Sequence, residues 1–120
     1  MSPFPRVLRV RQNFPPTPPV DIAPTIRAEF SKLSSEIKPG ARIAVGVGSR
    51  GITHLKEIVA AVLTELHSAG AQPFIIPAMG SHGGATPEGQ REVLASYDIT
   101  EATMGVPIHD ARTMNSSSKA

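Results

Sequence analysis

The chain has 120 residues, enough for one small domain, and a formal net charge of +2 at pH 7. It contains no cysteine, which excludes disulfides and thiolate metal sites and leads us to expect a cytoplasmic protein. Its basic residues form no run and do not alternate with aromatic ones, so we expect no binding to nucleic acid. No apolar stretch approaches the roughly 20 residues that cross a bilayer, and no apolar segment follows the first arginines, so we expect neither a membrane span nor a signal peptide.

The first 20 residues are rich in proline and are expected to form an extension before the domain. Residues 7–11 alternate apolar and basic side chains, a pattern that predicts a short edge strand. The prolines in 15–19 predict an extended, polyproline-like connector. We expect residues 21–112 to form the domain and 113–120 to be a polar tail.

Helical periodicity first appears over residues 21–37, with Asp21 near the start and Pro39 and Gly40 at the end. The apolar residues at helical spacing, which we expect to be buried, are Ile26, Phe30, Leu33 and Ile37. An apolar run at 43–47 predicts a strand, and an amphipathic stretch at 53–69, closed by Gly70, predicts a second helix.

A second strand is predicted at 73–77, followed by a helix at 87–96 with Thr86 as its N-cap and Pro87 in its first position. Residues 99–104 suggest a short helical turn, and 106–110 could begin another strand. Alternation of strands with helices, each connection long enough for a crossover, predicts an α/β fold. We expect a Rossmann-like parallel sheet with flanking helices, which is incomplete in this chain.

Glycine-rich loops follow both predicted strands, at the sheet edge where open α/β folds bind ligands. Histidine can move a proton near neutral pH, and arginine can clamp a carboxylate or a phosphate. We therefore expect Arg50 and His82 to face one crevice and to act together in catalysis. The alternative is a pair of exposed surface turns. The other candidate ligand-binding residues of the two loops and the helix start are Gly48, Ser49, Gly51, Gly80, Ser81, Gly83, Gly84 and Thr86.

Other patterns are weaker. The glycines from Gly46 to Gly51 match a dinucleotide fingerprint only in part, and the acidic residue expected about twenty positions later is missing. The four histidines lack the close spacing of a metal site, so we expect none within this chain. His54 is a minor site candidate because it lies near the first loop, whereas His67 and His109 are expected to have no catalytic role.

The segments from Ala44 to Ile52 and from Ile76 to Gln90 resemble the amino-terminal domain of the nickel-dependent lactate racemase family. The resemblance runs from about Lys38 to Ile108 and is closest to relatives with a Gly-Ser-Arg-Gly first loop. The Gly-Ser-His-Gly-Gly-Ala-Thr segment is its specific part. Characterised racemases carry an acidic residue in the first loop, where this chain has small or apolar residues.

The resemblance implies two α/β domains, a 2-hydroxy acid or related anionic substrate, and hydride abstraction with a nickel pincer nucleotide as cofactor. By resemblance, His82 falls on the family's first general acid/base, and Arg50 on an arginine that handles the anions of cofactor or substrate. The family's cofactor-tethering lysine, nickel-ligating histidine and second acid/base histidine lie downstream of the matched region and are absent from this chain. We therefore expect an amino-terminal piece of a longer enzyme, inactive as a racemase by itself and inclined to self-associate. The alternative is a truncated, non-catalytic module that binds an anion or a nucleotide.

Overall fold

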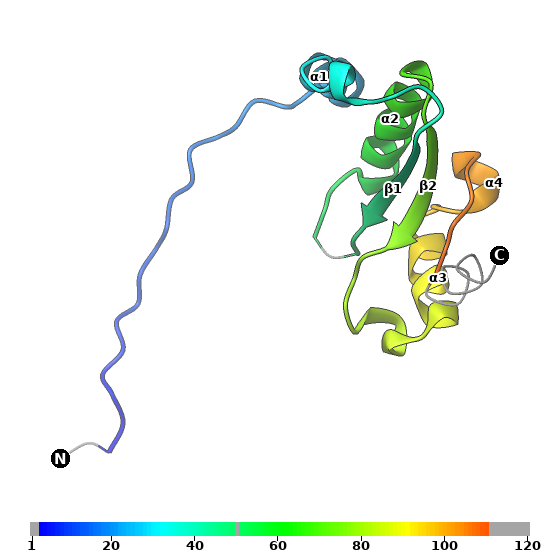
Figure 1. Cartoon of the computed structure of the whole chain (residues 1–120). Helices are drawn as coiled ribbons and strands as arrows, with labels where there is room; N and C mark the ends of the chain where they lie inside the picture. The colour runs from blue at the N-terminus through cyan, green and yellow to red at the C-terminus, as the bar shows by residue number, and fades with distance from the viewer. Residues whose placement is uncertain (1–2, 50, 111–120) are drawn as a thin grey trace.

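The computed structural model describes residues 3–49 and 51–110. Strands β1 (Arg42–Val47) and β2 (Gln72–Pro77) form a parallel two-stranded sheet, in which Val45 lies opposite Ile75 and Val47 opposite Pro77. Helix α2 (Leu55–Ser68) connects the two strands, as a parallel pair requires. Both strand arrows in Figure 1 point the same way, and α3 (Pro87–Ser96) lies beyond their tips. The expected α/β fold with a parallel sheet is confirmed.

The sheet gains one further contact from the segment after α4 (Glu101–Met104). Ile108 forms an isolated parallel bridge with Ile75, whose N–H donates to the carbonyl of Pro107 at 2.8 Å. The predicted strand at 106–110 is therefore present only as a bridge. A Rossmann-like sheet needs more strands than the described residues form.

The core lies where α2, α3 and β2 meet. Ile75, Leu94 and Ile99 are fully buried there. The rest of this apolar cluster comes from the strand ends, from α2 and from the segments around α4, and consists of Val47, Leu55, Val59, Leu63, Met79, Val106 and Ile108. Along β1, exposed Ala44 and Gly46 alternate with half-buried residues, so one face of this strand is left open within the described part. The core thus holds the carboxyl ends of both strands against two helices.

The first helix is shorter than predicted. Helix α1 spans Ile22–Phe30 and packs against α2, and a short 3₁₀ turn, η1 (Ser34–Glu36), follows. The expectation that Leu33 is buried was wrong, because its side chain is 53 % exposed. Serine hydroxyls compete for the backbone here: Ser31 Oγ donates to the carbonyl of Ala28 and Ser34 Oγ to that of Ser31. Such local bonds disfavour continuation of a helix.

The amino-terminal extension is a long extended segment that leads away from the folded part (Figure 1). The prediction of a strand at 7–11 was wrong, since these residues pair with no other strand among the described ones. Alternation alone cannot form a strand without a partner edge to supply hydrogen bonds. The large apolar side chains of the amino-terminal extension are exposed, including Val7, Leu8 and Val10. None of the described helices is both long and apolar enough to cross a membrane.

Candidate functional site

The two glycine-rich loops lie at the same edge of the sheet. Because β1 and β2 are parallel and in register to their last residues, the chain leaves both strands at neighbouring positions. The N–H of Ala78 donates to the carbonyl of Val47 at 2.8 Å and continues the pairing past the end of β2. The first loop therefore runs beside the second, as the sequence predicts.

Ser49 and His82 connect the two loops. A hydrogen bond joins Ser49 Oγ to His82 Nδ1, and the tautomer of the imidazole decides which atom donates. Ser49 is only 9 % exposed and is the buried polar residue of the described chain, while His82 is half-buried. His82 Nε2 makes no hydrogen bond with residues 3–49 or 51–110. One ring nitrogen is thus held by the protein, and the other is available for proton transfer.

Glycines let the second loop fold tightly against α3. Gly83 and Gly84 adopt left-handed conformations with φ of 64° and 66° inside the short 3₁₀ segment η2 (His82–Ala85). A Cβ on Gly83 would lie 2.5 Å from the backbone nitrogen of Gln90. A Cβ on Gly89 would lie 2.7 Å from the carbonyl carbon of Gly83. The Gln90 side-chain amide donates to the carbonyl of Gly80 at 2.8 Å. The backbone around His82 is therefore held by the first turns of α3.

The start of α3 is as predicted, with Thr86 as N-cap and Pro87 in the first position. Thr86 Oγ1 accepts from the N–H of Gly89 at 3.1 Å and donates to the carbonyl of Gly83 at 3.1 Å. The hydroxyl of this candidate ligand-binding residue is therefore already bonded within the protein, where it fixes the loop to the helix.

Tyr97 is a site residue that the sequence did not reveal. Its hydroxyl, at the end of α3, donates to the backbone carbonyl of Ser49 at 2.5 Å. The two residues are 48 positions apart, and no local pattern marks such a contact. Ser49 is therefore held at its carbonyl by Tyr97 and at its hydroxyl by His82.

The remaining candidate site residues take no part in the contact between Ser49 and His82 in the described structure. Arg50 lies outside the described residues. Gly48 is half-buried beside Ser49, and the other candidates around the two loops, Gly51, Gly80 and Ser81, are exposed. His54 is exposed and pairs with Glu57, at 2.6 Å between Nδ1 and Oε2, rather than with Ser49 or His82. His109 packs edge-on against the ring of Phe74, with 4.9 Å between the ring centroids.

The described residues contain no group of three or more His, Cys, Asp or Glu side chains that could hold a metal ion. One imidazole and one hydroxyl meet between the loops. These two groups suit proton transfer rather than metal coordination. A nickel ion would need ligands from outside these residues, as the resemblance implies with its downstream histidine. The described residues by themselves therefore offer no ligand set for a nickel ion.

Comparison of the chain with protein-family models, with curated proteins and with solved structures gave no match.

Proposed function

We propose that this chain is the amino-terminal part of a lactate-racemase-like enzyme that acts on a 2-hydroxy acid, and that His82 moves the proton of the substrate hydroxyl. The resemblance of both loops to that family supports the proposal. The observation that carries it is the hydrogen bond between Ser49 and His82, which holds the ring nitrogen Nδ1 and leaves Nε2 without a partner among the described residues.

The geometry suits a general base. For Nε2 to accept a proton, the neutral ring must carry its own proton on Nδ1, which then donates to Ser49 Oγ. When Nε2 takes the hydroxyl proton, the electron pair of that O–H bond forms the carbonyl bond of a 2-oxo acid as the α-carbon gives up a hydride. The resemblance implies that a nickel pincer nucleotide, held by residues outside the described ones, would supply the hydride acceptor when bound. The positively charged ring still donates from Nδ1 to Ser49, so one hydrogen bond serves both protonation states.

The substrate carboxylate needs a cationic partner near His82. Arg50 follows Ser49 in the sequence and has the residue type for this role, because a guanidinium can bind a carboxylate or a phosphate through two parallel hydrogen bonds. This assignment rests on the resemblance, which makes Arg50 the anion-binding partner of the base.

Replacement of the base tests the proposal. His82→Gln should be compared with the parent in a protein that carries this segment together with the downstream region of the family, with racemisation of lactate as the assay. Loss of a general base commonly lowers the rate by about 10²–10⁴-fold. His67→Gln, an exposed change in the last turn of α2, is the matched control and should leave the rate unchanged.

Two outcomes would contradict the proposal. Turnover that is unchanged in His82→Gln would remove His82 from the chemistry. Binding of lactate or of nicotinic acid mononucleotide by calorimetry, without any turnover in the parent protein, would instead favour the non-catalytic binding module.

A further inference from the structure

The outer edge of β2 is closed by the segment that follows α4. The N–H of Ile75 donates to the carbonyl of Pro107, and the carbonyl of Ile75 accepts from the N–H of His109, both at 2.8 Å. The guanidinium of Arg91, in α3, donates to the carbonyl of Ile108 and holds this segment in place. Strand β2 therefore has backbone partners on both sides.

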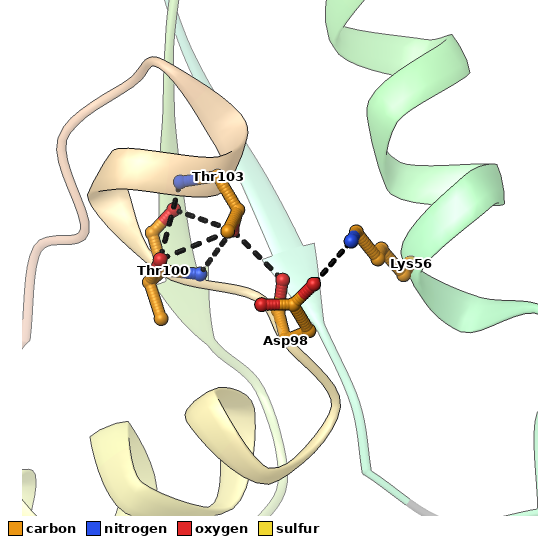
Figure 2. Close-up of polar contacts among 4 residues, drawn as sticks. All are labelled: Lys56, Asp98, Thr100 and Thr103. Carbon is orange, nitrogen blue, oxygen red and sulfur yellow. Dashed lines mark hydrogen bonds and ion pairs between the residues drawn. The ribbon is translucent and has the colours of Figure 1, made fainter.

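The approach to that segment is fixed as well. Figure 2 shows Lys56 of α2 paired with Asp98, whose carbonyl accepts from the Thr103 hydroxyl at 2.8 Å. Thr100 and Thr103 form the capping box of α4, from which the chain passes to its bridge with β2. The segment after α4 is therefore anchored on β2 and does not cover β1.

The outer edge of β1 has no partner among the described residues. The carbonyl of Val47 accepts from the N–H of Ala78, so the odd-numbered residues of β1 direct their backbone groups toward β2. Because successive residues of a strand direct these groups to opposite edges, those of Ala44 and Gly46 point away from β2. Both residues are exposed, and no described residue bonds to their N–H or C=O groups. Such an edge is a template for another strand.

The amino-terminal extension carries a strand pattern that lacks a partner edge. Residues 6–11, which we call the arm, read Arg-Val-Leu-Arg-Val-Arg and pair with no described strand. The side chains of Val7 and Leu8 are 89 % exposed, and that of Val10 is 85 % exposed. An extended segment of this kind can bond its backbone and cover its apolar side chains by adding to a free sheet edge.

The connector favours a second copy of the chain as the source of the added strand. Prolines at 15, 16, 18 and 19 keep the chain extended between the arm and α1. Figure 1 shows the extension leading away from its own sheet. The arm is therefore presented to a neighbouring molecule rather than to the β1 edge of its own chain.

We propose that the arm of one copy adds as a strand to the β1 edge of a second copy, and that mutual exchange of arms forms a dimer. Each copy supplies one arm and offers one edge, so a two-fold symmetric pair uses both arms and leaves neither edge open. This association requires no substrate and is independent of the function proposed above.

Sedimentation of the 120-residue chain measures the association, and the parent should form a dimer. The double variant Arg9→Pro/Val10→Pro removes an N–H donor from both edges of the arm, and should weaken dimerisation by at least about tenfold. Thr17→Pro is the matched control, because it adds a proline inside the existing proline tract, and it should sediment like the parent. All three positions lie in the extension, so thermal unfolding of the domain should be unchanged.

A spin label shows which edge receives the arm. Because the chain has no cysteine, Gln12→Cys, directly after the arm, can carry a single nitroxide. This chain, without isotope, would be mixed with nitrogen-15-labelled parent. The amide resonances of Ala44 and Gly46 in the parent should broaden more strongly than that of Ala102 in α4.

Three results would overturn the inference. The first is a parent that is monomeric at every concentration, and the second is a dimer that persists in Arg9→Pro/Val10→Pro. The third is broadening of Ala44 and Gly46 in an isotope-labelled chain that carries its own nitroxide but not in the mixture, which would place the arm on its own sheet.

Discussion

Gly89 offers a test of how closely the second loop packs against α3. In an ordinary helix interior, changing glycine to alanine stabilises by roughly 0.5–1 kcal/mol. Here the added Cβ would lie 2.7 Å from the carbonyl carbon of Gly83 and 2.9 Å from Thr86 Oγ1, and closer still to the Gly83 oxygen. These neighbours are backbone and a bonded cap, so the loop must move.

Overpacking of this kind costs about 1–3 kcal/mol, which exceeds the gain in helix propensity. Gly89→Ala should therefore lower the free energy of unfolding by about 1–2 kcal/mol, as measured by urea unfolding, and should shift the resonances of His82. Gly84→Ala is the control, since its Cβ would meet nothing within 4 Å and only the backbone strain at a φ of 66° remains. A Gly89→Ala chain that is more stable than the parent, with His82 unmoved, would refute the close packing of loop and helix.

Two other predictions concern the core and the open strand. Leu94→Ala, at a fully buried position, should cost about 2–5 kcal/mol by urea unfolding, while Leu33→Ala, at a position 53 % exposed, should change stability by less than about 0.5 kcal/mol; equal losses would contradict the burial described for these residues. Ala44→Lys places a charge on the exposed face of β1 and should reduce self-association of the chain in light scattering, because charged side chains protect strand edges from pairing; a parent that is monomeric at every concentration would contradict this expectation.

The parts of the fold that depend on local sequence could be predicted. The strands at β1 and β2, the helix between them and the cap of α3 follow from apolar runs, helical spacing and the Thr86–Pro87 pair. The end of α1 could not, because serine hydroxyls bond to the backbone where the apolar spacing continues as far as Ile37. The extension at 7–11 failed as a strand for a different reason: its alternation is real, but a strand needs a partner.

The site was predictable to the level of its loops. Parallel strands bring their carboxyl ends to one edge, so the two loops were expected side by side, with Arg50 and His82 as the predicted pair; the contact between Ser49 and His82 was not predicted. Their hydrogen bond depends on side-chain positions, and the contact of Tyr97 with Ser49 joins residues 48 positions apart. Neither contact can be predicted from residue spacing or composition, because both arise from packing between secondary-structure elements.

A double-mutant cycle on turnover tests most directly whether Ser49 and His82 act as one unit. In a protein with the downstream region, lactate racemisation would be measured for the parent, Ser49→Ala, His82→Gln and the double variant. Ser49→Ala alone should slow turnover by about tenfold, equivalent to about 1.4 kcal/mol, and should have no further effect once His82 is replaced. Independent, additive losses, or full activity in Ser49→Ala, would contradict the account.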